Sequence, residues 1–372
     1  MSLQSSYGYS GKKFSVVNDD CICFISANAV CVWNITIGKK DFLWSKKNGY
    51  TACTANYMKG YIAAAEYGLD PDIHIYKYPG SQMVAKIKAE TKIKCTDLTF
   101  SRDCTRLLMI GDKPDYKISI YDLEERKMLT INETLKDKQY LKAEFNPADS
   151  DQFYVASPNV LTFYSIIRNS YTITKDENGE GTINKWERVN SAIFKPKDAE
   201  NMDAPPDLIF NDIIWDPYSK LYITTNEKII YQIDFNTGEE KARINTEDIV
   251  SSLVLTQRHL IASLDNKRII WYSALPPEET IASQQVLQKD KLIQLQDEIM
   301  QDYIFENGNV GHMSYTKSYK KLTIGCTDGF LSSLPVEAEI YNEEEEEDEE
   351  GSVKEMKTIN SSLTELGKFY IF

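Results

Sequence analysis

The feature that most constrains the fold is a strand–turn–strand unit that occurs twice, with Pro71 and Pro114 at matching places 43 residues apart. The first copy, Tyr61–Pro79, has an apolar stretch, a turn around Pro71 and a returning stretch in which apolar and polar residues alternate. The second copy, Arg106–Leu123, repeats this order around Pro114. Self-similarity at this period is typical of β-propellers, in which each four-stranded blade is one repeat. The sequence therefore predicts an all-β chain that folds as a β-propeller.

Similar strand signals place seven blades along the chain. The predicted first strands begin near Phe14, Tyr50, Ile93, Tyr140, Leu208, Asp248 and Asn309. One blade alone buries neither of its faces, so the blades are expected to stack on one another. The last strand of blade seven is expected within Lys354–Asn360. An unrelated β-sandwich is the alternative, but it does not explain why the strands come in similar sets.

Two segments interrupt the repeat. Arg168–Asp207 is long and polar, which predicts an insertion after blade four that forms a protruding hairpin. Pro276–Asp302, before blade seven, has apolar residues at helical spacing, and we expect a short amphipathic helix there. The residues that define this spacing are Leu292, Leu295, Ile299 and Tyr303. Such a helix would either pack on the flank of the propeller or dock a partner.

An acidic run, Glu343–Glu350, lies near the C-terminus. A block of like charge predicts a solvated, disordered loop, which we place at residues 343–353; binding of a basic partner is the alternative. The propeller is then expected to occupy residues 1–342. Residues 354–372 are expected to form a C-terminal segment that is able to add a closing strand.

Charge and cysteine content restrict the environment and the partners. The net charge is −14, and the acidic run contributes eight of these charges, which leaves −6 for the rest. This balance argues against nucleic acid or a membrane as a partner and favours basic patches on proteins. The seven cysteines are an odd number and scattered, which predicts a reducing compartment. There is no apolar signal at the N-terminus and no apolar stretch of the about 18 residues that span a bilayer. We expect synthesis and residence in the cytoplasm or in a compartment continuous with it.

The sequence contains few signals of catalysis or metal binding. Its three histidines are His74, His259 and His312, and no HExxH or CxxC spacing accompanies them. Cys21 and Cys23 lie on one face of a predicted strand and are expected to be a buried apolar pair. We therefore expect no enzyme activity and no catalytic, cofactor-binding or metal site. The alternative is a hydrolase centred on the propeller channel, which would show a polar cluster with perturbed carboxylates at the axis.

The turns of the two repeated hairpins are candidate partner-binding sites. In antiparallel meanders, the turns between second and third strands emerge on one face together with the segments that connect blades. Gly68–Asp72 and Gly111–Asp115 are therefore expected to be neighbours. Proline stiffens each turn, and the aromatic residues beside it supply the contact area that interfaces favour. The candidates are Tyr67, Asp70, Pro71, Asp72, Lys113, Pro114, Asp115 and Tyr116. The alternative is that these segments are simply stable turns.

Several of these segments also carry a family resemblance. They are Ala63–Gly80, Gly111–Leu129 and Phe145–Ile166, preceded by a Tyr-Gly-Tyr element at residues 7–9. They resemble the first propeller of ciliary WD-repeat proteins of the cilia- and flagella-associated protein 43 and 44 type. The resemblance is strong over roughly residues 7–166 and weaker, but compatible, to about residue 336.

The resemblance implies a structural scaffold of the axoneme in a cilium or flagellum. Such proteins form a tether complex that holds inner-arm dynein motor domains near doublet microtubules. The implied partners are a second axonemal WD-repeat propeller protein, dynein heavy chain and proteins associated with doublet microtubules. Docking on a microtubule would use basic surfaces such as Lys317–Lys321. Such proteins continue past one propeller, so a chain that ends at Phe372 is expected to be a shortened or split relative. The alternative function is that of a general cytosolic WD-repeat adaptor.

Overall fold

The computed structural model describes residues 9, 13–131, 142–157, 160–166, 174–175, 181–182, 186–190, 209–216, 219–235, 237–256, 259–275, 294–304, 308–316, 321–329, 331–336 and 364–365. All regular secondary structure in these residues is β-strand. This part of the chain contains no helix that is long and apolar enough to cross a membrane.

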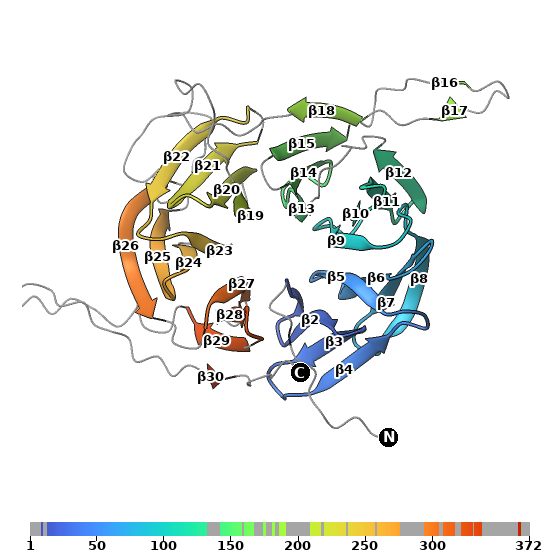
Figure 1. The fold of residues 1–372 in the computed structure, drawn as a ribbon, viewed down its shortest axis with the longest axis horizontal. Coiled ribbons are helices and arrows are strands. Elements are labelled where there is room, and N and C mark those ends of the chain that lie inside the picture. The colour runs from blue at the N-terminus through green and yellow to red at the C-terminus, as the bar shows by residue number, and fades with distance from the viewer. Residues whose placement is uncertain are drawn as a thin grey trace, which may run out of the picture. The chain divides into compact units, whose positions relative to one another are not determined.

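The described strands form seven four-stranded sheets, and each sheet is a meander that follows chain order (Figure 1). Neighbouring strands in these sheets run antiparallel. This is the architecture of a seven-bladed WD-type β-propeller, so the predicted fold class is confirmed. The strands belong to two compact units: Lys13–Val250, and Met1–Lys12 together with Ser251–Phe372.

The unit Lys13–Val250 contains blades one to five. Blade one is β1 (Ser15–Asn18), β2 (Cys21–Ser26), β3 (Ala29–Asn34) and β4 (Lys40–Trp44). Blade two is β5 (Tyr50–Asn56), β6 (Tyr61–Glu66), β7 (Asp72–Lys77) and β8 (Gln82–Lys88). Blade three is β9 (Cys95–Phe100), β10 (Arg106–Gly111), β11 (Ile118–Asp122) and β12 (Lys127–Ile131). Blade four is β13 (Lys142–Phe145), β14 (Gln152–Ser157), β15 (Val160–Ile166) and β18 (Trp186–Asn190). Blade five is β19 (Phe210–Trp215), β20 (Lys220–Thr225), β21 (Ile229–Asp234) and β22 (Glu240–Asn245).

The other unit contains the last two blades. Blade six is β23 (Val250–Leu255), β24 (His259–Leu264), β25 (Arg268–Leu275) and β26 (Gln294–Ile304). Blade seven is β27 (Val310–Thr316), β28 (Lys321–Cys326), β29 (Leu331–Pro335) and β30 (Thr364–Glu365). Tyr9 is buried against β28, where a Cβ on Gly325 would lie 2.6 Å from the Tyr9 hydroxyl oxygen. Only glycine leaves room for the Tyr9 ring at that position.

The core consists of apolar layers between consecutive blades. Between blades two and three, for example, Ala63 and Ile75 pack with Leu98, Leu107 and Met109. Further layers lie between blades one and two, three and four, four and five, and six and seven. The expectation that the blades bury their faces by stacking is therefore confirmed within each unit.

This layering explains why the second strands of blades two and three read as continuous apolar runs. In β6, Ala63 and Ala65 face the layer shared with blade three, whereas Ile62 and Ala64 face the layer shared with blade one. In β10, Leu107–Ile110 divides in the same way between blades two and four. A strand that is covered on both faces needs apolar residues at every position.

The prediction of an amphipathic helix within Pro276–Asp302 is wrong for the described part of this segment. Residues Gln294–Ile304 form β26, which pairs with β25 as the fourth strand of blade six. A spacing of four residues, as between Leu295, Ile299 and Tyr303, is compatible with a regular strand as well as with a helix, because four is a multiple of two. The outer edge of β25 needs hydrogen-bond partners, and β26 supplies them.

Fourth strands account for the other differences from the sequence predictions. Within Arg168–Asp207, β16 (Thr174–Lys175) and β17 (Gly181–Thr182) form the expected hairpin, but β18 completes blade four. In blade seven, β30 pairs with β29 at Ser332–Glu365 and Ser333–Thr364. The expected strand Lys354–Asn360 and the acidic run lie outside the described residues, as does Leu292.

Candidate functional site

The two repeated turns lie side by side because both bind the same connector. The backbone N–H groups of Gly68 and Asp70 donate to the carbonyls of Ile93 and Lys92, both at 3.0 Å. From the other turn, Asp112 donates to Lys94 at 3.0 Å. The connector between β8 and β9 is thus held by the β6–β7 turn on one side and the β10–β11 turn on the other.

Asp115 fastens the second turn to this connector with its side chain. Its carboxylate accepts hydrogen bonds from the Lys92 backbone N–H and the Thr91 hydroxyl, both at 3.2 Å. On the far side of the first turn, the Tyr67 N–H donates to Gly49 in the β4–β5 connector at 2.9 Å. Gly68 has φ +136°, and a Cβ there would lie 3.1 Å from the Asn48 amide nitrogen, so the turn requires glycine.

We call this surface the Leu69 face. It consists of Ser45–Gly49, Tyr67–Pro71, Glu90–Lys94 and Asp112–Lys117, with the adjoining side chains of Lys86 and Lys88. Leu69 is 85% exposed and Tyr67 46% exposed. Sequence reasoning missed Leu69, although a leucine at the centre of a turn, where polar residues are usual, was a detectable signal.

The structure separates the eight predicted partner-binding residues by exposure. Exposed side chains belong to Tyr67, Asp70, Lys113 and Pro114, and half-buried ones to Asp115 and Tyr116. Pro71 and Asp72 are buried, so their side chains shape the turn from below. A partner on this face would contact the first group directly.

Asp72 is the centre of a lysine cluster beneath the Leu69 face. It is 2% exposed, and its carboxylate pairs with Lys47 and Lys86 at 2.9 Å and with Lys88 at 3.0 Å. Lys47 also reaches Glu66 at 3.3 Å. Burial by itself would raise the pKa of Asp72, but the hydrogen bonds from Lys86, Lys47 and Lys88 hold that pKa well below its ordinary value. The carboxylate therefore stays ionised.

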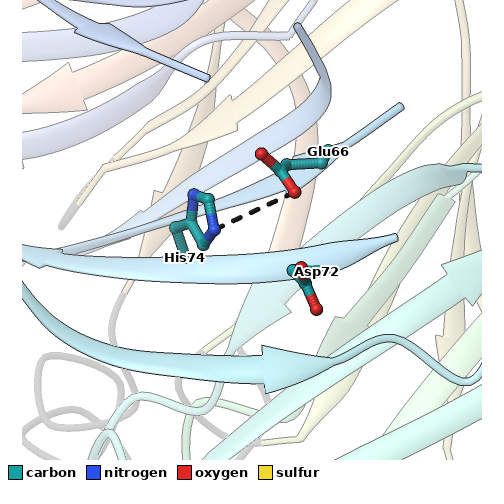
Figure 2. A group of neighbouring side chains, drawn as sticks. All are labelled: Glu66, Asp72 and His74. Carbon is teal, nitrogen blue, oxygen red and sulfur yellow. Dashed lines mark ion pairs between the residues drawn. The ribbon is translucent and has the colours of Figure 1, made fainter. Parts of the chain in front are cut away.

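His74 and Glu66 extend this cluster into blade two (Figure 2). The His74 Nε2 atom lies 3.9 Å from a Glu66 oxygen, and its Nδ1 atom is hydrogen-bonded to the Tyr50 hydroxyl at 2.9 Å. Burial lowers the pKa of His74 despite the opposing effect of Glu66. The imidazole is therefore neutral at pH 7 and acts as a hydrogen-bonding core residue.

Glu66, Asp72 and His74 are also a candidate metal-binding group. Each offers a ligand atom, and these atoms lie within 4.8 Å of one another (Figure 2). However, the carboxylates already hold lysine ammonium groups, and a metal ion would have to displace them. The arrangement therefore fits an ion-pair cluster better than a metal centre.

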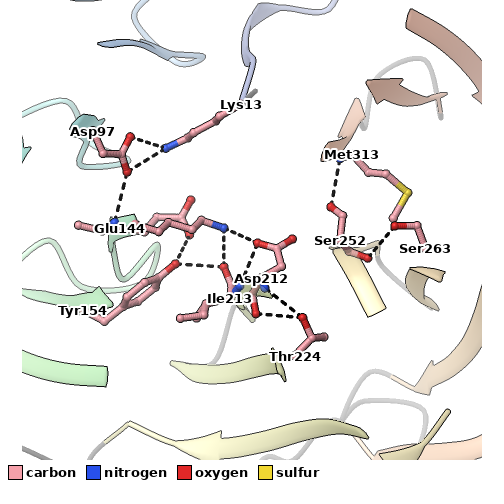
Figure 3. A network of polar contacts seen from close by, with 12 residues as sticks. Lys13, Asp97, Glu144, Tyr154, Asp212, Ile213, Thr224, Ser252, Ser263 and Met313 are labelled. Atoms are coloured by element: carbon pink, nitrogen blue, oxygen red, sulfur yellow. Dashed lines mark hydrogen bonds and ion pairs between the residues drawn. The ribbon is translucent and has the colours of Figure 1, made fainter. Parts of the chain in front are cut away.

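A second polar network joins the first strands of blades three, four and five (Figure 3). The Lys142 ammonium group donates to Asp212 and to the Ile213 carbonyl, both at 2.7 Å. Tyr154 donates to the same carbonyl at 3.0 Å. Asp97 accepts from the Ala143 backbone N–H at 3.2 Å, which links β9 to β13.

The charge states of this network do not resemble those of an active site. Burial would lower the pKa of Lys142, but Asp212 and Glu144 raise it above its ordinary value. Burial and Glu144 raise the pKa of Tyr154. Lys142 is therefore cationic and Tyr154 neutral at pH 7, so neither is prepared to act as a nucleophile or base. The network fits the joining of blades better than hydrolysis.

A similar link occurs in the other unit. The Met313 N–H in β27 donates to the Ser252 hydroxyl in β23 at 3.2 Å (Figure 3). In both units, a polar side chain on the first strand of one blade accepts from the backbone of the next blade. The polar residues on these first strands thus serve the stacking of blades.

Comparison with known proteins agrees with this architecture. No protein-family model matches the chain. The chain is similar to cilia- and flagella-associated protein 43 of Xenopus laevis, with 24% identity over 159 residues, which is 43% of this chain and 10% of that protein. Its similarity to cilia- and flagella-associated protein 44 of Mus musculus is 22% over 170 residues, which is 45% of this chain and 9% of that protein. Over somewhat less than half of its length, the chain is thus similar to cilia- and flagella-associated proteins 43 and 44.

Solved structures show the same fold. The Cps50 (Swd1) β-propeller domain of Myceliophteria thermophila matches with a TM-score of 0.55 and 16% identity, over 77% of this chain and 83% of that one. A chain of the mitotic checkpoint complex matches with a TM-score of 0.58 and 12% identity, over 88% of each chain. At these identities the likeness concerns the fold alone. The curated relatives are far longer, since the match covers about a tenth of their length.

Proposed function

We propose that this chain is a non-enzymatic protein-interaction scaffold of the ciliary axoneme. The observation that carries the proposal is the similarity to two different cilia- and flagella-associated proteins, combined with the propeller fold. The polar clusters of blades two to five support the non-enzymatic part, because their buried carboxylates are held in ion pairs with lysines.

Within the axoneme, we propose that the chain belongs to a tether complex that links inner-arm dynein motor domains to doublet microtubules. Its partners would be a second WD-repeat propeller protein, dynein heavy chain and proteins associated with the doublet. The Leu69 face is the proposed contact surface, with Tyr67, Asp70, Lys113 and Pro114 touching the partner. Rigid backbone turns support this role because little conformational entropy is lost when they are contacted.

The test is the location of an epitope-tagged full-length chain in ciliated cells of its source. After detergent extraction of isolated cilia, we expect the tagged chain in the axonemal pellet, since a structural tether stays attached when the membrane is removed. A soluble membrane-matrix marker and a doublet protein are the controls for extraction. Recovery of the chain in the cytosol, with none in axonemes, would contradict the proposal and favour the general adaptor function.

A further inference from the structure

We propose that the Leu69 face binds an acidic segment of a partner protein that carries a large apolar side chain beside its carboxylates. The inference rests on the proposed scaffold function for the existence of a partner, and adds the chemistry by which that partner is recognised. Its first support is the apolar anchor point. Tyr67 and Leu69 are exposed large apolar residues only two positions apart in one turn. Two large apolar side chains that are exposed on one hydrogen-bonded turn supply apolar contact area for a partner.

The second support is the charge around this anchor point. The exposed lysines of the Leu69 face are Lys46, Lys47, Lys86, Lys88, Lys92 and Lys113. Among the carboxylates, Asp70 is exposed, Glu90 and Asp115 are half-buried, and Glu66, Asp72 and Asp112 are buried. The face therefore presents positive charge in a chain whose net charge is −14. A partner segment rich in carboxylates complements it, and the general expectation of basic partners does not hold at this face.

The third support is the way in which the lysines are held. Lys86, Lys88 and Lys47 all reach down to the single carboxylate of Asp72, so three ammonium groups gather where Asp72 and Glu66 supply two negative charges. The excess positive charge lies next to the turn that carries Leu69. A phosphate-bearing ligand would use these lysines but would leave Leu69 and Tyr67 in water, so the apolar pair favours a protein segment.

The experiment measures binding of a fluorescein-labelled synthetic peptide, Gly-Glu-Glu-Leu-Trp-Glu-Glu-Gly, to the full-length chain by fluorescence anisotropy. We expect saturable binding that is at least tenfold tighter than that of the same peptide with glutamine at every glutamate. Leu69→Ser should weaken binding about tenfold, because the buried area of one leucine is lost. The double variant Lys92→Glu, Lys113→Glu should weaken it about tenfold and reduce its dependence on salt.

Two variants at the opposite ends of the same blades are matched controls. Met58→Ser removes another exposed apolar side chain, 68% exposed, in the β5–β6 turn of blade two. Lys127→Glu reverses an exposed charge in blade three. Lys127 pairs with Asp122, and both lie at the end of the blade opposite to Gly111. Both should bind the peptide like the unmodified chain. Equal losses in control and test variants, or equal binding of the glutamine peptide, would overturn the proposal.

A further variant, in which Glu343–Glu350 is replaced by a glycine–serine linker, tests whether the chain's own acidic run occupies the Leu69 face. If the peptide binds only this variant, then the chain's own acidic run covers the face, and the proposal of a partner segment is overturned. The peptide experiment and the test of the scaffold proposal can fail independently of each other. An axonemal chain that does not bind the peptide would contradict only the docking chemistry, whereas peptide binding by a chain absent from axonemes would contradict only the ciliary role.

Discussion

The Asp72 cluster and the Lys142–Asp212 network, both in the Lys13–Val250 unit, differ in how far their lysines are exposed to solvent. In blade two, Asp72 is buried, and its three lysines are largely in solvent, as Lys88 is, with 67% of its side chain exposed. In the network between blades four and five, Lys142 is 20% exposed and donates to two acceptors that face it. The first cluster therefore presents charge to the surface, and the second uses its charge internally.

Lysine–carboxylate ion pairs therefore serve two purposes in this chain. Where the cation lies between blades, removing it leaves a carboxylate that few water molecules can reach, and stability depends on it. Where several exposed cations share one buried carboxylate, the fold depends little on any one of them, and each is available to a partner.

The largest effect is expected from Lys142→Met, which keeps most of the side chain's length but leaves Asp212 without this cation. The free energy of unfolding should fall by about 3 kcal/mol, as for other half-broken buried ion pairs. Urea unfolding followed by tryptophan fluorescence measures it. A loss below about 0.5 kcal/mol would show that the network does not hold the blades together.

The next effect is expected from Asp72→Asn, which removes the anion shared by three lysines. At pH 7 the free energy of unfolding should fall by about 2 kcal/mol. Because the pKa of Asp72 is lowered in the folded chain, its contribution is complete above the ordinary value near pH 4 and is lost as pH falls further. The difference between the two chains should thus shrink in acid. Asp70→Asn, at the exposed carboxylate in the same turn, is the control and should change stability by less than about 0.5 kcal/mol.

A smaller effect is expected from Lys86→Met. Lys47 and Lys88 still pair with Asp72 in this variant. The loss in the free energy of unfolding should be less than about 1 kcal/mol, in contrast to that of Lys142→Met. The same urea titration serves as the measurement, and equal losses in the two lysine variants would remove the distinction between the clusters.

The smallest effect on stability is expected from Leu69→Ser. Leu69 is 85% exposed, so the melting temperature should stay within about 1 °C of that of the unmodified chain, since surface changes alter stability by less than about 0.5 kcal/mol. Differential scanning calorimetry measures it. A marked drop in melting temperature would mean that Leu69 supports the turn, and its role in binding would then lose its basis.

Much of the fold follows from the sequence because first, second and third strands carry clear signals. The second strands are buried on both faces and read as apolar runs, as in Leu107–Ile110. Fourth strands were the weak point. β8 is largely exposed, and β26 shows a spacing that suits a helix equally well. An outer strand is defined by the edge it pairs with, and that edge is not visible in local sequence.

The candidate site could be predicted in part. The shared face of the two turns follows from the strand order, and the turns do share one connector. The burial of Pro71 and the lysine cluster around Asp72 could not be read from the turn motif, because Lys86 and Lys88 reach Asp72 from the neighbouring strand β8. The inner network could not be predicted either, since Lys142 and Asp212 are 70 residues apart.

Cross-linking mass spectrometry on isolated axonemes from the source cell tests the central claim most directly. With an amine-reactive cross-linker, the account predicts links from Lys92 and Lys113 on the Leu69 face to dynein heavy chain or to a second WD-repeat propeller protein. Lys127, at the opposite end of blade three, should form few of these links. If the chain is recovered from axonemes with its partner links concentrated away from the Leu69 face, or is absent from axonemes altogether, the account is contradicted.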